Sequence, residues 1–154
     1  MKKIILVFSV IFLVGCSDHS ENIDSQSIDK NETFNWRLVT SWPKNYPGLG
    51  MAPERIADLV EEMSDGQMKI TVYGAEEQVP AFGVFDAVSS GSHQMGHSGG
   101  YFWKGKVPAA QFFTSVPFGL TADEINAWVN RGGGLELWRE IYAPFNIYPI
   151  PAGN

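Results

Sequence analysis

The sequence has few of the residues that several common kinds of protein require. Of its 154 residues only Cys16 is a cysteine, which excludes internal disulfides and CxxC metal sites. Lysine and arginine total 11 against 17 aspartates and glutamates, and they form no basic cluster, so we expect no nucleic-acid partner. Apolar residues nevertheless make up 44% of the chain, which is typical of a packed globular protein.

The amino terminus has the pattern of an export signal. Two lysines precede an apolar run, residues 4–14, that is too short to span a bilayer as a mature helix. Residues 13–16, Leu-Val-Gly-Cys, look like a bacterial lipobox, whose cysteine becomes the lipidated amino terminus after cleavage. We therefore expect residues 1–15 to be a removed signal peptide and Cys16 to carry a lipid anchor. The alternative is an ordinary secretory peptide with an incidental cysteine.

Residues 16–33 have the composition of a tether. From residue 17 onwards this segment holds five acidic residues, one base and only two aliphatic side chains. Such a segment cannot bury enough apolar surface to offset the entropy lost on ordering. We expect a flexible spacer that joins the lipidated cysteine to a folded region over residues 34–154.

The folded region begins with alternating strands and helices. The apolar patterns predict strands at residues 34–40, 68–73 and 93–97. Helical apolar spacing predicts helices from near Ala52 to Gly66 and over residues 82–90. This order is typical of an α/β fold with a mainly parallel sheet flanked by helices.

The second part of the folded region is expected to be mainly helical. Residues 111–120 are apolar and predict an extended buried segment before the helices begin. Thr121 and Glu124 form a capping-box pattern that opens a helix, and a further helix covers residues 135–142. We interpret the glycines at residues 132–134 as a hinge between these helices, because no Lys-Ser or Lys-Thr follows them as in a phosphate-binding loop.

Residues 91–106 form the candidate functional stretch. A short strand there leads into a glycine-rich loop with aromatic residues at 101–103. Exposed backbone and flat side chains at the carboxyl end of a sheet are typical of ligand sites in open α/β folds. Trp42 and Tyr46, which follow the first strand, either line the same cleft or cap the core. The expected role of this stretch is to bind a small molecule.

The stretch also contains a motif of serine hydrolases. Gly96-His97-Ser98-Gly99-Gly100 fits the pattern G-x-S-x-G, in which the serine is the nucleophile. That chemistry needs a helix directly after the serine and a later histidine to accept its proton. Residues 101–108 show no helical spacing, and no histidine follows His97. The sequence therefore favours Ser98 as a polar loop residue or a hydrogen-bond donor to a ligand.

His93 and His97 lie four residues apart and would share one side of the predicted strand. A metal-binding pair is conceivable at this spacing. No carboxylate occurs in the strand as a third ligand, so the pattern favours two ordinary histidines and predicts no metal site in this chain.

Six segments carry a family resemblance that runs in order through residues 34–154. They are residues 78–88 (QVPAFGVFDAV), 94–97 (QMGH), 101–106 (YFWKGK), 116–119 (VPFG), 132–138 (GGGLELW) and 149–154 (PIPAGN). They resemble the DctP-type solute-binding subunits of tripartite ATP-independent periplasmic (TRAP) transporters. The likeness is greatest to the branch that binds 2-oxo acids and related monocarboxylates.

The resemblance implies two α/β lobes that close on a carboxylate and deliver it to a sodium-driven membrane permease, without catalysis. The chain then corresponds to the first lobe and the start of the crossover to a second lobe. The family's carboxylate-pairing arginine, a glutamine contact and its metal-binding glutamate would lie beyond Asn154. The resemblance assigns ligand binding to Tyr101, with Phe82, Trp103 and Asn154 as further cleft candidates.

The expected protein is a periplasmic lipoprotein that meets the membrane only through its anchor, and the chain would be a truncated piece of it. No cofactor is expected in the chain, although the resemblance implies that a sodium or calcium ion accompanies the ligand in the complete protein. Two alternatives stay open. One is a lipid-anchored serine hydrolase that uses Ser98, and the other is a stand-alone lobe that acts as an interaction protein.

Overall fold

A computed structural model describes residues 32–114 and 116–152 of the chain. The predicted signal peptide, the predicted lipidation site Cys16, residues 16–31 of the predicted tether and the cleft candidate Asn154 lie outside the described residues. Within those two ranges, no helix combines the length and the apolar character needed to cross a membrane.

A three-stranded parallel sheet forms the first half of the molecule. Its strands are β1 (Phe34–Thr40), β2 (Met68–Tyr73) and β3 (Met95–His97), in the order β2-β1-β3. β1 is the central strand, and its Leu38 pairs with Val72 on one side and Met95 on the other. The predicted parallel α/β architecture is therefore confirmed, as are the bounds of the first two strands.

The third strand begins two residues later than predicted. His93 N donates to the Ala87 carbonyl at 3.1 Å instead of joining the sheet. The Arg37 N–H of β1 is taken by the side-chain oxygen of Gln94 at 2.9 Å, where a backbone carbonyl would continue a strand. The prediction of a strand from residue 93 is wrong because these two contacts replace the first ladder bonds.

Two helices cover opposite faces of the sheet. α1 (Met51–Met63) packs Ala57 against Leu38, whereas α2 (Val84–Ser89), preceded by a 3₁₀ turn η1 (Ala81–Gly83), packs Val84 near Val39. Neighbouring residues of a strand point to opposite faces, so Leu38 packs against α1 and Val39 packs against α2. The predicted helices are confirmed in place, although the second one starts with a 3₁₀ turn.

The second half is helical and begins with two 3₁₀ segments. These are η2 (Gly100–Trp103) and η3 (Pro108–Phe113). The predicted extended buried segment at residues 111–120 is wrong. Its first part belongs to η3, and Gly119 N then donates to the Val116 carbonyl in a turn that leaves Phe118 fully exposed, with a φ of 58°.

The two α-helices that follow match the sequence prediction. Thr121 and Glu124 form the capping box of α3 (Ala122–Arg131). Gly133 has a φ of 85°, which only glycine adopts without strain, and it joins α3 to α4 (Gly134–Tyr142). A final 3₁₀ turn, η4 (Ala143–Phe145), leads into residues without regular structure.

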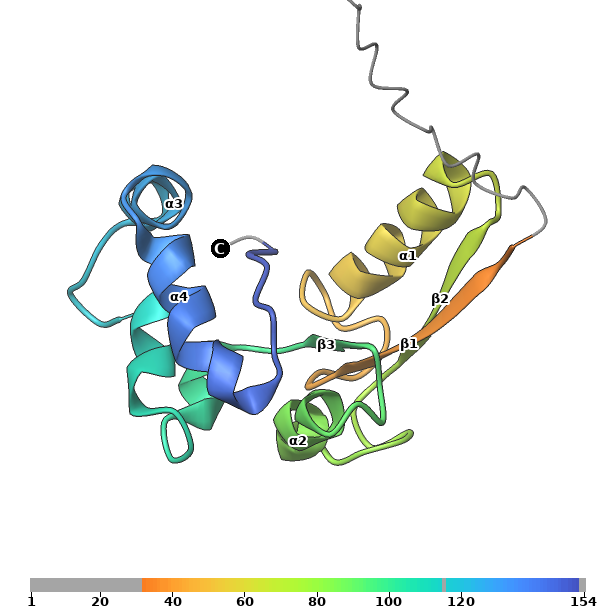
Figure 1. Cartoon of the computed structure of the whole chain (residues 1–154), viewed down its shortest axis with the longest axis horizontal. Coiled ribbons are helices and arrows are strands. Elements are labelled where there is room, and N and C mark those ends of the chain that lie inside the picture. The colour runs from red at the N-terminus through yellow and green to blue at the C-terminus, as the bar shows by residue number, and fades with distance from the viewer. Residues whose placement is uncertain (1–31, 115, 153–154) are drawn as a thin grey trace, which may run out of the picture.

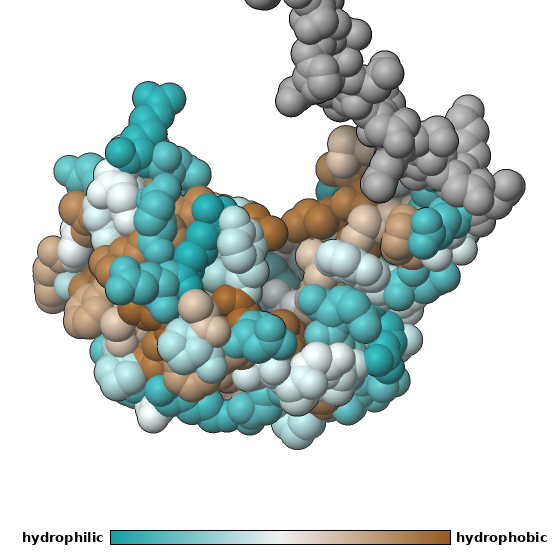
Figure 2. Space-filling view, in the orientation of Figure 1, coloured by the Kyte–Doolittle hydropathy of each residue, from teal (hydrophilic) through white to brown (hydrophobic). Residues whose placement is uncertain are grey.

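One apolar cluster joins the two halves. Val39 of the sheet and Phe85 of α2 belong to the same buried cluster as Trp103 of η2 and Tyr142 of α4. In Figure 1 the sheet with α1 forms one half, α3 and α4 lie in the other, and the carboxyl ends of β1 and β3 point toward the boundary. Figure 2 shows the surface hollowed between the halves, with apolar surface beside the hollow.

We predict that Gly96→Ala destabilises the sheet. A Cβ at Gly96 of β3 would lie 2.8 Å from the side chains of both Val84 and Val88, because α2 lies directly against this strand. Such overpacking costs about 1–3 kcal/mol. Urea unfolding followed by circular dichroism measures the loss. Gly105→Ala is the control, since nothing lies within 4 Å of its Cβ. Equal unfolding midpoints for the two variants would contradict the close packing.

Candidate functional site

Five rings gather at the carboxyl ends of β1 and β3, and we call them the edge cluster. Its members are Trp42, Phe82, His97, Tyr101 and Phe102. Phe102 is central, with ring centroids 4.5 Å from Tyr101, 5.2 Å from Phe82 and 6.1 Å from Trp42. The Trp42 and His97 rings lie 5.0 Å apart. The cluster thus combines the ends of both strands with η1 and η2.

The chain order explains why these rings meet. Trp42 follows β1 by two residues and His97 is the last residue of β3, and parallel neighbours end at the same edge of a sheet. Phe82 lies on η1 and Tyr101 on η2. Of the two aromatic residues that the sequence left open, Trp42 joins the edge cluster. Tyr46 makes none of the ring contacts recorded for the described residues.

Two of the predicted ligand-binding residues are exposed at this edge, and one is not. Tyr101 is 41% exposed and Phe82 is 66% exposed, so both can touch a ligand. Trp103 is only 5% exposed and packs against Phe85 at 5.4 Å. Its place in the core leaves Tyr101 and Phe82 as the accessible pair.

Hydroxyl groups connect the chain segments beside the rings. Ser41 Oγ donates to the Ala81 carbonyl at 2.8 Å and lies 2.7 Å from Ser98 Oγ. Ser41 N also donates to the His97 carbonyl at 3.0 Å. Thr40 Oγ1 lies 3.4 Å from His97 Nδ1. Sequence reasoning missed Ser41 and Thr40, although their position at the end of the central strand could have pointed to them.

The geometry does not support a hydrolytic role for Ser98. Its hydroxyl is bonded to Ser41, and in the described part of the chain no hydrogen bond links it to a histidine. The segment after it, Gly100–Trp103, is a single 3₁₀ turn, whereas the nucleophile elbow needs an α-helix.

The histidine spacing does not form a metal pair. His93 lies before β3, buried at 7% exposure, with its Nδ1 3.2 Å from Ser92 Oγ. The expectation that both histidines share one side of a strand is therefore wrong. Among residues 32–114 and 116–152, no group of three His, Cys, Asp or Glu side chains is placed to hold a metal ion.

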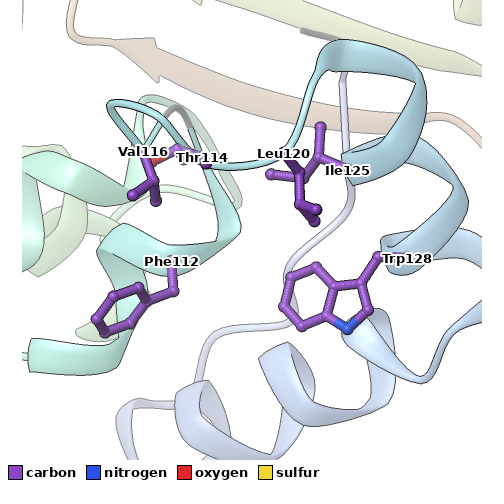
Figure 3. A pocket seen from close by; sticks show the side chains of 7 residues that line it. Phe112, Thr114, Val116, Leu120, Ile125 and Trp128 are labelled. Carbon is purple, nitrogen blue, oxygen red and sulfur yellow. The ribbon is translucent and has the colours of Figure 1, made fainter.

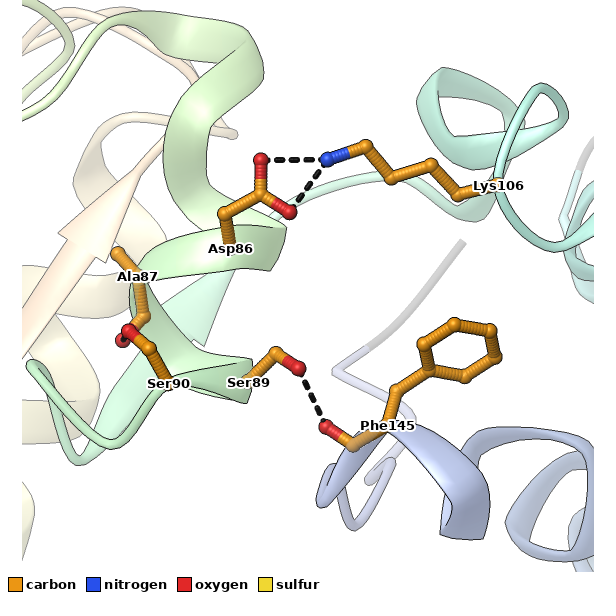
Figure 4. Close-up of polar contacts among 6 residues, drawn as sticks. All are labelled: Asp86, Ala87, Ser89, Ser90, Lys106 and Phe145. Atoms are coloured by element: carbon orange, nitrogen blue, oxygen red, sulfur yellow. Dashed lines mark hydrogen bonds and ion pairs between the residues drawn. The ribbon is translucent and has the colours of Figure 1, made fainter.

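Two lysines beside the site, Lys106 and Lys44, are already engaged. Lys106, which follows η2, forms an ion pair with both carboxylate oxygens of Asp86 (Figure 4). Lys44, in the loop after β1, lies 3.9 Å from Glu54 and 3.7 Å from Glu77. The edge cluster therefore offers an anion flat apolar surface and the Tyr101 hydroxyl, and Lys44 and Lys106 are not free to pair with that anion.

A second hollow, of about 250 Å³, lies between η3 and α3 (Figure 3). Its lining is almost entirely apolar, so it lacks the groups that would pair with a carboxylate. The residues around it are Phe112, Thr114, Val116, Gly119, Leu120, Ile125 and Trp128.

Residues 38–150 match the family model described as bacterial extracellular solute-binding protein, family 7, also called DctP. This match covers most of the described residues. The chain belongs to that family.

Several members of the family are similar to the chain over most of its length. A monocarboxylate 2-oxoacid-binding periplasmic protein of Nostoc sp. is 47% identical over 119 residues, which is 77% of this chain and 32% of that protein. A TRAP solute-binding protein of Pseudoalteromonas atlantica, solved with sodium and pyruvate, is 46% identical with a TM-score of 0.76. It covers 78% of this chain, which matches 36% of that structure.

A third relative repeats the likeness. The TRAP solute-binding protein of Colwellia psychrerythraea, solved with calcium and pyruvate, is 42% identical with a TM-score of 0.76, and the match covers 78% of this chain and 37% of that one. The chain thus spans about a third of the length of the family members it matches. The predicted family is confirmed.

We predict that Gly99→Ala displaces Tyr101. A Cβ at Gly99 would lie 2.6 Å from Cε1 and Cζ of the Tyr101 ring, which folds back over this glycine. The end of a side chain can move without its backbone, so stability should fall by only about 1 kcal/mol or less. Nitration by tetranitromethane, followed by mass spectrometry, should modify Tyr101 faster in the variant. Tyr46 serves as the internal reference, and an unchanged rate ratio would contradict the contact.

We predict a lowered pKa for His97, because its burial disfavours the charged imidazole. The unfolded chain then binds the proton more readily, so the free energy of unfolding falls as the pH drops from about 6.5 to the lowered pKa. Below that pKa the loss is complete. NMR titration of the imidazole resonances measures the pKa, and a midpoint at or above 6.5 would contradict its burial. His97→Gln should remove only part of the pH dependence of stability, because burial and Arg37 also lower the pKa of His93.

Proposed function

We propose that the chain forms one lobe of a TRAP-type solute-binding protein that captures a small carboxylate, with pyruvate and related 2-oxo acids favoured. The observation that carries this proposal is the likeness to a 2-oxoacid-binding protein and to two pyruvate-bound structures over 77–78% of the chain. Its exposed aromatic edge, where β1 and β3 end, supports the same conclusion.

In this proposal the edge cluster supplies one wall of the ligand site. Tyr101 offers a hydroxyl and a ring face, and Phe82 offers a ring face, which together suit a short planar acid. Burial of the ligand requires a second wall, which closes over the first and excludes water. Ligand then shifts the open–closed equilibrium by its preference for the closed state.

The proposal assigns the charge and the metal to the rest of the protein. A carboxylate is paired most strongly by a bidentate arginine, and Lys44 and Lys106 are already paired with acids. A sodium or calcium ion would accompany the ligand. Groups outside the described residues would hold most of it, because the described residues contain no cluster of three His, Cys, Asp or Glu side chains that could hold a metal ion. The protein would act in the periplasm, tethered to the membrane through lipid on Cys16, and deliver its ligand to a sodium-driven permease.

The two other readings have weaker support. A serine hydrolase would need Ser98 bonded to a base, and the hydroxyl is bonded to Ser41 instead. A stand-alone lobe that acts as an interaction protein would use the same exposed edge, and it differs from our proposal in binding no carboxylate.

A chimera tests the proposal. Residues 38–150 replace the matching part of the Pseudoalteromonas protein, and pyruvate is titrated calorimetrically with sodium and then calcium present. The whole unmodified chain is titrated in parallel, and we expect it to bind weakly because the edge cluster supplies only one wall of the proposed site. The chimera should bind pyruvate. A folded chimera that binds no 2-oxo acid would overturn the proposed ligand class.

Within the chimera, Tyr101→Ala should weaken pyruvate binding about ten-fold or more, since an aromatic anchor contributes on the order of 1–2 kcal/mol. Phe112→Ala is the matched control. Phe112 is also exposed, at 58%, but it lies on η3 beside the second hollow and does not belong to the edge cluster. Equal losses in the two variants would argue against Tyr101 as a ligand contact.

A further inference from the structure

One buried hydroxyl connects the segments that carry the two exposed rings. Ser41 is 7% exposed and donates to the carbonyl of Ala81, the residue before Phe82. Its Oγ also lies 2.7 Å from the hydroxyl of Ser98, which precedes Gly99. Phe82 and Tyr101 thus sit on segments that are bonded to the same atom.

The direction of these bonds follows from counting protons. A serine hydroxyl has one proton, and Ser41 donates its proton to the Ala81 carbonyl. The bond between the two serines must therefore be donated by Ser98. Ser98 has no second proton to offer an anion, so a carboxylate at this edge cannot accept from it while the chain of bonds is intact.

The positions of the Phe82 and Tyr101 rings depend on the positions of these segments, because the Tyr101 ring packs against its own segment and both rings pack against Phe102. The Tyr101 ring rests on Gly99, where a Cβ would come within 2.6 Å of it, so movement of residues 98–99 must move the ring. Phe82 and Tyr101 both contact Phe102, at 5.2 and 4.5 Å between centroids. The gap between the two exposed rings is thus set by Phe102 between them and by the hydroxyl bonds at their base.

We propose that Ser41 is a positioning residue that fixes the gap between Phe82 and Tyr101 and thereby selects small carboxylates over bulky ones. This inference rests on the proposed function for its ligand class. Ser41 does not touch the ligand, because it is buried and both of its hydroxyl bonds go to the protein. A neutral chain of bonds also holds the rings without placing a charge beside an anion.

The first test needs no ligand and uses the whole chain. 3-Fluorotyrosine labels all five tyrosines, and Tyr101→Phe identifies the ¹⁹F resonance of Tyr101. In Ser41→Ala and in Ser98→Ala, that resonance should shift or broaden. Ser89→Ala is the matched control, because it removes another serine-to-carbonyl bond, from Ser89 Oγ to the Phe145 carbonyl (Figure 4). An unmoved Tyr101 resonance in both edge variants would overturn the positioning role, and Ser98→Ala decides the matter if Ser41→Ala fails to fold.

The second test measures selectivity in the chimera. The affinity for pyruvate relative to phenylpyruvate should fall about ten-fold in Ser41→Ala, which is the scale of one or two hydrogen bonds. Ser89→Ala should leave the ratio unchanged. A merely structural role would weaken both acids equally, so a constant ratio in Ser41→Ala contradicts the inference. If the unsubstituted chimera binds neither acid, the proposed function fails, and the ¹⁹F result still decides the positioning role.

Discussion

β1 is hydrogen-bonded along both of its edges to strands that run in its own direction. Parallel pairing makes neighbouring strands finish at the same edge of a sheet, and side chains just past that edge are brought together whatever their distance in sequence. Ser41 and Ser98 are separated by 57 positions and yet share a hydrogen bond. The edge cluster exists because of this pairing, and a shift of β3 against β1 by one residue would exchange its faces and disperse the cluster.

The aromatic loop places neighbouring residues in two different environments. Trp103 is buried with Phe85 and Tyr142, and it fastens the loop to the core shared by both halves. Tyr101 remains exposed at the edge. In a 3₁₀ turn, residues two apart face different directions, so one can anchor the turn while the other meets a ligand. A rigid anchor directly beside an exposed ring reduces the entropy lost when that ring contacts a ligand.

Local patterns were sufficient to predict the first two strands, the capping box at Thr121 and the glycine junction between α3 and α4. Each depends on residues close together in sequence. The segment at residues 111–120 was predicted wrongly because its apolar content does not show whether a tertiary partner covers it, and the turn at Pro117 and Phe118 directs the side chain of Phe118 outward. The start of β3 was also predicted wrongly, because a side chain, Gln94, replaces a backbone partner.

The sequence indicated those residues of the candidate site that local pattern or the family resemblance marks, and it missed those that only tertiary contacts bring together. Tyr101 and Phe82 stood out through the aromatic loop and the family resemblance, whereas Trp103 belongs to a core that only tertiary packing defines. Local pattern alone did not distinguish Ser41 from the other serines of the chain. Its proposed role depends on contacts with Ala81 and Ser98, which lie 40 and 57 positions later in the sequence. A search of the positions directly after each parallel strand would have included it.

The electrostatics of the edge bear on how a bound acid could be released. The edge cluster consists of rings with neutral hydroxyls beside them, and two lysines in the flanking loops, Lys106 and Lys44, are paired with Asp86, Glu54 and Glu77. In the proposed receptor, strong charge pairing with the ligand would come from the second lobe. The lobe described here would contribute shape and exclude water. An ion pair gains strength when water is excluded, so such a carboxylate would be held tightly only while the lobes are closed. Opening of the lobes would let water reach the ion pair between the ligand and the second lobe, which would weaken binding. No ion pair between the ligand and this lobe would have to break. A rigid aromatic surface without a free charge is thus suited to a receptor that must bind its ligand selectively and then release it.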